Sequence, residues 1–157
     1  MSEKTKNVFI SHIHADDSRL DDLKSLMEKG GYSIRDGSID SRKPNNAQDP
    51  DYIKREILAP RIKWAGTLIV LISKKTCESE YVNWEIEYAQ KNNTRIVGVY
   101  DRGAQESDLP DAFHKFGDAL VGWQTDRVMD AVNGKINNFF TPDGKEFERR
   151  PISRYDC

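Results

Sequence analysis

Residues 67–73, with the sequence TLIVLIS, limit the fold of this chain more than any other segment. Apolar side chains fill every position from Leu68 to Ile72. A strand with one face in water would alternate apolar and polar residues, so this pattern indicates a strand buried on both faces. Such strands are typical of parallel sheets that carry helices on both sides. The segment therefore predicts a central strand of an α/β domain.

Four further runs that are rich in apolar and β-branched residues have the length of strands. They are residues 7–11, 32–35, 95–100 and 119–123. Helical spacing of apolar residues marks four other segments, at residues 16–29, 51–64, 81–91 and 126–140. Strands that alternate with helices form right-handed βαβ units and hence a parallel sheet covered on both faces. We therefore expect a flavodoxin-like three-layer α/β/α sandwich with a five-stranded parallel sheet of order 2-1-3-4-5.

The length of 157 residues is that of one domain, and no long linker rich in Gly, Ser or Pro divides the chain. Residues 141–157 are polar and contain many turn-forming residues. We expect residues 1–140 to form the domain and residues 141–157 to be a polar C-terminal tail.

Charge and composition disfavour several classes of function. The 24 Lys and Arg residues are matched by 26 Asp and Glu residues, and a net charge of -2 gives no reason to expect a nucleic-acid partner. The longest apolar run is too short to cross a membrane, and the first residues contain no apolar leader, so we expect no membrane association and a cytoplasmic location. The 2 cysteines and 3 histidines are too few and too scattered to form a metal centre, and we expect no metal.

Ligands of an open parallel sheet bind beyond the carboxyl ends of the strands, where the strand order reverses. In the expected order this point lies between the first and third strands, which end near Ser11, His12 and Ser73. Ser38 lies in the long polar loop after the second strand. Hydroxyl groups beside helix N-termini can donate hydrogen bonds to a diphosphate, so these four residues are candidate nucleotide ligands. Ordinary turn residues are the alternative interpretation.

Glu85 is the candidate catalytic residue. At about 100° per residue, Val82, Ile86 and Ala89 share one face of the predicted helix, while Glu87 points away from that face. Glu85 lies on the flank of the apolar stripe, where it can be half buried at the rim of the strand ends. A carboxylate in that place can stabilise an oxocarbenium ion on ribose or orient a ribose hydroxyl. A surface glutamate of an amphipathic helix is the other interpretation, and spacing alone does not choose between them.

Three segments, taken in order, resemble the TIR superfamily. They are VFISHIHAD, then IKREI followed by WAGTLIVLIS, and finally SEYVNWEIEYAQ. The resemblance extends from Val8 to about Tyr100 and is greatest to bacterial TIR-like proteins, which include the NAD-cleaving component of Thoeris anti-phage systems. It implies the same flavodoxin-like fold that the strand pattern predicts.

In the register of this resemblance, an aromatic residue precedes the functional glutamate by four positions and an aliphatic residue follows it. Tyr81, Glu85 and Ile86 occupy those positions. The resemblance thus implies that Glu85 is catalytic and that Tyr81 and Trp84 contribute to substrate binding. Two positions depart from the common pattern: Tyr81 stands where many relatives have Trp, and His12 stands where many have Tyr or Phe.

The resemblance also implies an activity. An NAD⁺ nucleosidase of this kind releases nicotinamide and forms ADP-ribose, a cyclic ADP-ribose isomer or a conjugate, with NAD⁺ as substrate and no cofactor. Its product would act as a signal in antiviral defence and would be sensed by a downstream effector. Family members commonly need self-association or a trigger protein, and the polar loop at residues 36–50 lies where an assembly loop falls.

Two alternatives remain open at this stage. A TIR-like adapter would use the same fold for signalling without catalysis, and Glu85 would then be dispensable. A nucleoside deoxyribosyltransferase-like enzyme would also set a glutamate against a glycosidic carbon in a related fold. A phosphoacceptor domain is disfavoured, because the third strand ends in Ser73 where such a domain would carry Asp.

Overall fold

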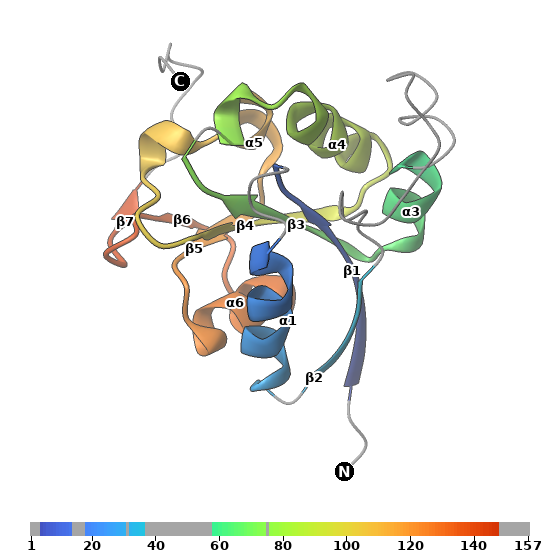
Figure 1. Ribbon diagram of the computed structural model, residues 1–157, viewed down its shortest axis with the longest axis horizontal. Coiled ribbons are helices and arrows are strands. Elements are labelled where there is room, and N and C mark those ends of the chain that lie inside the picture. The colour runs from blue at the N-terminus through green and yellow to red at the C-terminus, as the bar shows by residue number, and fades with distance from the viewer. Residues whose placement is uncertain (1–3, 14–17, 31, 37–57, 75, 148–157) are drawn as a thin grey trace.

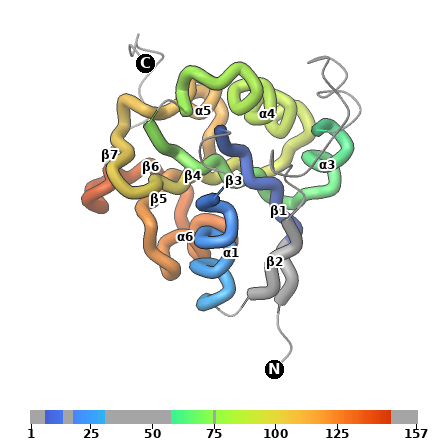
Figure 2. The backbone as a smooth tube through the Cα atoms, viewed as in Figure 1, coloured from blue at the N-terminus to red at the C-terminus, as the bar shows by residue number. Residues whose placement is uncertain are grey.

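The computed structural model describes residues 4–13, 18–30, 32–36, 58–74 and 76–147 of the chain. In these residues, one sheet lies between two layers of helices (Figure 1). The same arrangement can be followed along the backbone in Figure 2. The predicted α/β/α sandwich is confirmed.

The sheet is parallel over most of its width. In chain order its strands are β1 (Lys4–Ser11), β2 (Tyr32–Asp36), β3 (Thr67–Ile72), β4 (Arg95–Tyr100), β5 (Ala119–Val121), β6 (Phe139–Phe140) and β7 (Glu146–Phe147). They lie side by side in the order β2-β1-β3-β4-β5-β6-β7. Neighbouring strands from β2 to β6 are parallel, whereas β6 and β7 are antiparallel. The predicted order 2-1-3-4-5 is therefore confirmed, and two short strands extend the sheet beyond it.

The last helix is shorter than the sequence predicts. A helix was expected over residues 126–140, but α6 (Thr125–Val132) ends well before that point. Gly134 has a φ of +83°, a left-handed conformation that favours glycine and ends the helical path. Phe139 then pairs with Leu120 of β5 instead of continuing the helix.

Each face of the sheet has its own helices. In Figure 1, α3 (Ala59–Trp64), α4 (Glu80–Lys91) and α5 (Asp111–Phe116) lie above the sheet, and α1 (Leu20–Glu28) and α6 lie below it. Short 3₁₀ turns, η3 (Thr76–Glu78) and η4 (Glu106–Asp108), precede α4 and α5. None of the helices in the described residues is long and apolar enough to cross a membrane.

The central strand β3 is buried at all of its positions, as the sequence predicts. Leu68, Val70 and Ile72 pack into the core beneath α4 and α5. Ile69 and Leu71 pack into the opposite core, against α1 and α6. Burial of apolar surface on both faces is the main stabilising contribution of this strand.

Ser79 caps the helix that carries Glu85. Its side chain accepts a hydrogen bond from the Val82 N–H, which satisfies one of the unpaired donors of the first turn of α4. Val82, Ile86 and Ala89 are fully buried, so the predicted apolar face of this helix is confirmed.

A glycine in β4 brings α5 close to the sheet. A Cβ atom at Gly98 would lie 2.6 Å from Cζ of Phe113 in α5 and 2.9 Å from Cδ1 of Leu120 in β5, so a side chain at this position would force its neighbours to shift. Since α5 in turn packs against α4, this close approach helps to fix the height of α4 above the sheet.

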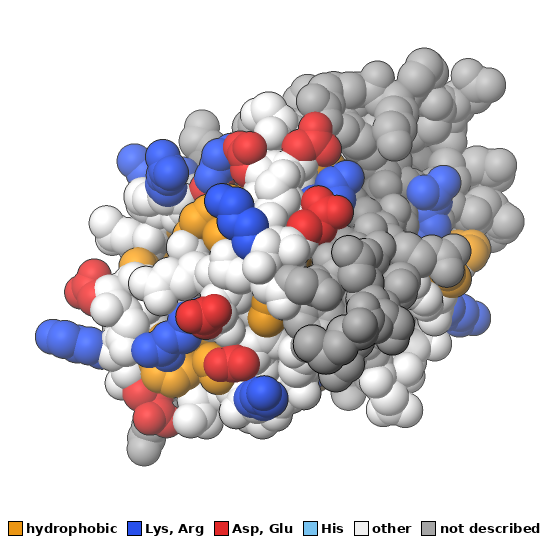
Figure 3. All heavy atoms as spheres, turned by 90° about the horizontal axis from the view of Figure 1, so that it is seen from below, with side chains coloured by type: hydrophobic (Ala, Val, Ile, Leu, Met, Phe, Trp, Pro, Cys, Tyr) orange, Lys and Arg blue, Asp and Glu red, His pale blue; other side chains and the backbone are white. Residues whose placement is uncertain are grey.

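The described surface is mixed in charge. On the face seen in Figure 3, Lys and Arg side chains are interspersed with Asp and Glu, and hydrophobic side chains show only in small areas. Trp64, at the end of α3, is the one large hydrophobic side chain that is exposed in the described part of the chain.

Candidate functional site

A hydrogen bond joins the end of β1 to the middle of α4. The Ser11 hydroxyl donates to Oε1 of Glu85 at 2.6 Å. Ser11 is 0% exposed and Glu85 is 5% exposed, so the bond lies inside the protein. Ser11 is the last residue of β1 and pairs with Val70 of β3, which places the pair at the carboxyl edge of the sheet. This is the edge at which the sequence predicts the site.

Glu85 is more deeply buried than the sequence predicts. Its place on the flank of the apolar stripe suggested half burial, but the fold brings it against the end of β1. Burial raises the pKa of Glu85 to about 8, and the smaller effect of the Ser11 hydrogen bond lowers it. Glu85 is therefore a neutral acid at pH 7 in the absence of a ligand.

This arrangement allows two kinds of chemistry. An ionised Glu85 would face an apolar interior and would strongly stabilise a positive charge that develops beside it. A neutral Glu85 could instead donate its proton to a leaving group. Buried carboxyl groups with a strongly raised pKa at the ligand-binding edge of a sheet are candidate functional residues.

His12 follows Ser11 and is turned back towards the strand. Its Nδ1 lies 3.0 Å from the carbonyl oxygen of Ile10. Because a carbonyl can only accept, Nδ1 carries the hydrogen in this contact. The structure places His12 beside Ser11 at the predicted edge, with its ring partly buried.

Ser73 belongs to the turn that leads from β3 into α4. Its N–H donates to Oγ1 of Thr76 at 2.8 Å, and the two hydroxyl oxygens are 3.1 Å apart. Thr76 is fully buried and was not predicted as a site residue, although its spacing of three from Ser73 is typical of a hydroxyl turn. The structure thus brings Ser73 to the predicted edge but shows it in a turn contact.

The two predicted aromatic residues lie on α4 near Glu85. Tyr81 and Trp84 are partly buried against the core beneath α4, and the ring of Trp84 stacks on that of Tyr88 at 5.1 Å. These contacts are packing contacts within the helix layer. Ser38, the remaining predicted ligand, lies outside the described residues.

Asn83 is a positioning residue that the sequence reasoning missed. Its side-chain oxygen accepts a hydrogen bond from the Ala112 N–H at the start of α5, and its Nδ2 donates to the Ser79 carbonyl. It therefore joins the N-terminal turns of α4 and α5. An isolated Asn gives no such signal, because the contact with Ala112, 29 positions away, comes from the tertiary structure.

An ion pair on the opposite face of the sheet was also missed. Arg19, just before α1, donates through Nε and Nη2 to the carboxylate of Asp101, which follows β4, at 2.8 to 3.1 Å. The guanidinium also lies 4.7 Å from the centroid of the Trp123 ring and donates to Asp22. The pair thus ties the start of α1 to the connections that follow β4 and β5.

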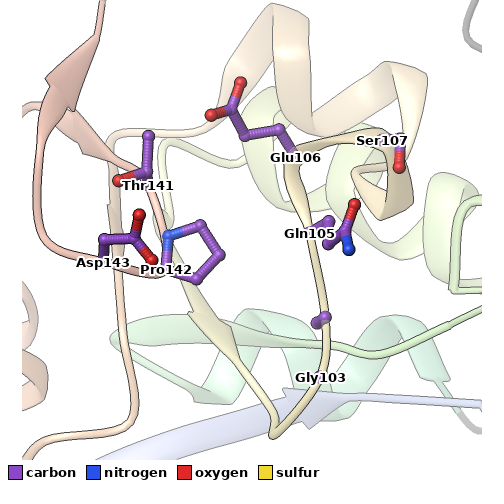
Figure 4. Close-up of a pocket in the computed structure, with 8 residues that line it drawn as sticks. Gly103, Gln105, Glu106, Ser107, Thr141, Pro142 and Asp143 are labelled. Atoms are coloured by element: carbon purple, nitrogen blue, oxygen red, sulfur yellow. The ribbon is translucent and has the colours of Figure 1, made fainter.

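A hollow of about 660 Å³ lies farther along the same carboxyl edge (Figure 4). Residues 103–107, after β4, form one side of it, and residues 141–143, after β6, form the other. Its lining includes the carboxyl groups of Glu106 and Asp143 but none of the predicted site residues. In the described residues, no group of three or more His, Cys, Asp or Glu side chains is placed to hold a metal ion.

The family comparison gives a match over more than half of the chain. Residues 9–106 match the family described as Thoeris protein ThsB, TIR-like domain. This range includes Ser11 at the end of β1 and all of α4, with Glu85. No protein of curated function gives a significant match.

Solved structures with related folds have little sequence identity to the chain. The CMP N-glycosidase BcmB of Clostridium botulinum is 17% identical with a TM-score of 0.50, over 82% of this chain and 98% of that one. The TIR domains of the activated Roq1 resistosome are 17% identical with a TM-score of 0.42, over 60% of this chain and 57% of that one. A conserved protein from Enterococcus faecalis V583 is 11% identical with a TM-score of 0.43, over 86% and 81%. The first of these likenesses shows the fold alone.

Proposed function

The chain belongs to the family of the TIR-like domain of the Thoeris protein ThsB, and from that premise we propose that it cleaves the bond between nicotinamide and ribose in NAD⁺. The observation that carries the proposal is the buried Glu85 carboxyl group, held by the Ser11 hydroxyl at the carboxyl edge of the sheet. Ligands of such sheets bind at this edge.

The chemistry of NAD⁺ suits a site built around one carboxyl group. When the glycosidic bond breaks, its electron pair moves to the ring nitrogen, so nicotinamide leaves as a neutral molecule and needs no proton. The positive charge passes to the ribose as an oxocarbenium ion. Water then adds to the anomeric carbon and loses a proton to give ADP-ribose, or another nucleophile gives a cyclic or conjugated product. Stabilisation of the oxocarbenium ion is the task that a carboxylate performs in glycoside cleavage.

The energetic cost of Glu85 favours an enzyme over an adapter. A buried carboxyl group that is held by one hydroxyl destabilises the fold whenever it ionises, whereas an apolar side chain of similar size would not. An adapter that assembles through its surface has no use for such a group. Residues that cost stability at a binding edge are typical of functional sites.

A second candidate activity follows from the same pKa. Because burial keeps Glu85 protonated at neutral pH, it could donate a proton to a departing neutral base, as cleavage of a nucleotide such as CMP requires. The likeness of the fold to a CMP N-glycosidase makes CMP the natural comparison substrate.

The decisive experiment is incubation of the wild-type protein with NAD⁺, CMP and deoxynucleosides in separate reactions, followed by chromatography of the products. Release of nicotinamide supports the proposal, and release of cytosine alone supports the second candidate. Absence of all cleavage by wild-type protein over a range of concentrations would favour the adapter. On the proposed function, the ADP-ribose product is the signal for a downstream effector in antiviral defence.

A further inference from the structure

The surroundings of Glu85 supply one hydrogen bond and an apolar contact surface. Ser11 donates to Oε1, which leaves Oε2 to carry the proton of the neutral acid. The neighbouring buried residues of α4, Val82, Ile86 and Ala89, are apolar. This environment solvates the neutral acid adequately and the carboxylate poorly.

The titratable groups on the elements around Glu85 do not offset this imbalance. On α4 itself, Glu80, Glu87 and Lys91 are exposed, as are Arg61 and Lys63 of α3 and Glu78 of η3. On β4, Arg95 donates to the carbonyl groups of Ala131 and Ile136. The remaining titratable groups on the described elements around α4 are Tyr81, Tyr88, Tyr100, Asp111, His114, Lys115 and, after β1, His12. The influences on the carboxyl group are burial and the Ser11 hydrogen bond, and no charged group of the described residues adds to them.

Glu85 therefore lacks the charge that its proposed role requires. NAD⁺ carries a positive charge on its nicotinamide ring before the bond breaks. An opposite charge within about 4 to 6 Å of a carboxyl group lowers its pKa by roughly 1 to 3 units, which is enough to ionise between about half and nearly all of Glu85 at pH 7.

We infer that the substrate ionises its own catalytic group: a bound pyridinium riboside converts Glu85 from acid to carboxylate, and one proton passes to the solvent. This inference rests on the proposed function and adds to it a prediction about which substrates the site selects. The site selects N-glycosides whose leaving ring is cationic, because only these bring the charge that makes Glu85 active. Neutral N-glycosides of the same shape leave Glu85 protonated.

The inference can be measured without turnover. The cationic probe is the carbocyclic analogue of NAD⁺, which cannot be cleaved, and the neutral probe is NADH, which keeps the diphosphate and the adenosine. Titration calorimetry at pH 7 in phosphate and in Tris, which differ in ionisation enthalpy, gives the number of protons released on binding. A pKa that falls from about 8 to between about 5 and 7 releases about 0.4 to 0.9 proton per site at pH 7, so we expect a count in this range with the carbocyclic analogue and none with NADH.

Two variants test whether the proton that is released on binding comes from Glu85. Glu85→Gln keeps the volume and an acceptor for Ser11 but has no proton to release, so its count should fall to zero with either probe. Ser11→Ala keeps the acid and should still release a proton, with weaker binding of the cationic probe. These variants are needed only for assignment, since the contrast between the two probes is made on the wild-type protein.

The outcomes separate the inference from the proposed function. If wild-type protein releases nicotinamide from NAD⁺ but the carbocyclic analogue binds without proton release, the inference is wrong and the proposed function stands. If the same proton count is found with NADH, charge selection is likewise wrong. If the analogue does not bind and NAD⁺ is not cleaved, both are overturned.

Discussion

Oγ of Ser11 lies 2.6 Å from Oε1 of Glu85, although 74 positions separate the two residues in the chain. The contact joins the last residue of β1 to α4, in the helix layer above the sheet. At this contact the strand edge that is predicted to bind the nucleotide meets the helix that is predicted to carry the acid. A substitution of either residue should therefore change the ionisation of Glu85 or the hydrogen bond of Ser11.

Replacement of Glu85 by Gln should lower nicotinamide release from NAD⁺ by at least about 100-fold, because the isosteric amide cannot carry the negative charge that stabilises the oxocarbenium ion. The matched control is Glu87→Gln, on the exposed face of the same helix, which should retain activity within about twofold of wild type. The measurement is initial rate at matched folded fraction, checked by circular dichroism. Equal losses in the two variants would remove Glu85 from its proposed role.

The pH profile separates the two candidate activities. If the carboxylate form acts on NAD⁺, kcat/KM should rise with pH and level off above about 8, the pKa of Glu85 in the free protein. If the acid form acts on CMP, kcat/KM should fall through the same region. Ser11→Ala removes a donor that favours the charged form, so the NAD⁺ profile should move to higher pH. A profile for wild-type protein that is flat from pH 6 to 9 would contradict a titrating Glu85.

Stability should fall as the pH rises, in the opposite direction to an ordinary ion-paired carboxylate. Burial raises the pKa of Glu85 from 4.5 to about 8, so between these values the folded protein keeps a proton that the unfolded chain has lost. The free energy of unfolding should decrease by about 1.4 kcal/mol per pH unit in this window from this group alone. The contribution is absent below pH 4.5 and constant above about pH 8.

Glu85→Gln is the control for this effect, since it cannot titrate. Its free energy of unfolding relative to wild type should increase by about 3 kcal/mol between pH 5 and pH 7. Urea denaturation at several pH values measures the difference. Parallel curves for the two proteins would show that Glu85 is solvated in the folded state.

The ion pair between Arg19 and Asp101 should contribute measurably to stability. Asp101 is only 10% exposed, so Arg19→Met leaves a poorly solvated carboxylate and should cost about 1 to 3 kcal/mol. The double variant Arg19→Met with Asp101→Asn should lose less stability than the sum of the losses in the two single variants. We expect this coupling to be at least about 1 kcal/mol. Arg127→Met, which removes a guanidinium 4.9 Å from the Phe140 ring centroid, is a control for loss of a ring contact. Strict additivity would show that the pair contributes nothing.

Activity should depend on assembly. On the family resemblance, the isolated protein is a slow enzyme whose specific activity rises with concentration or with a trigger, because association orders the loop at residues 36–50. Of these residues the structure describes only Asp36, which is the last residue of β2. The measurement is specific activity against enzyme concentration for wild type and for Arg42→Ala with Lys43→Ala. A dilute monomer with high and constant turnover would refute gating by assembly.

The fold could be predicted from sequence because its main signals are local. The apolar run of residues 68–72 and the alternation of strand and helix patterns specify the sheet and its first five strands. The end of α6 could not be found in this way, since Ile136 and Phe139 continue the helical spacing of the apolar residues before them. Strand β6 exists only because Phe139 pairs with Leu120, which no local pattern reveals. Helix α5 is 6 residues long and too short to show a period.

The site could be predicted only to the level of the edge and the helix. Helical spacing put Glu85 beside the apolar stripe, and strand order put Ser11 at the binding edge. Their contact, and with it the burial of Glu85, depends on how closely α4 packs against β1. This distance is set by the packing of α4 against several elements. The pair of Arg19 with Asp101 spans 82 positions and was invisible for the same reason. Side-chain partners that lie far apart in sequence are a product of the fold and are not encoded near either residue.

The placement of β1 has a consequence for the order in which the protein becomes active. One side of β1 pairs with β2, but its other side must wait for β3. Thr67 of β3 pairs with Val8 and follows it by roughly sixty residues, and long-range pairing of this kind is slow to form. Helix α4 is synthesised later still. A nascent chain on the ribosome therefore carries Ser11 without its acid, and the pair comes into being only after α4 has emerged and has packed onto a finished sheet.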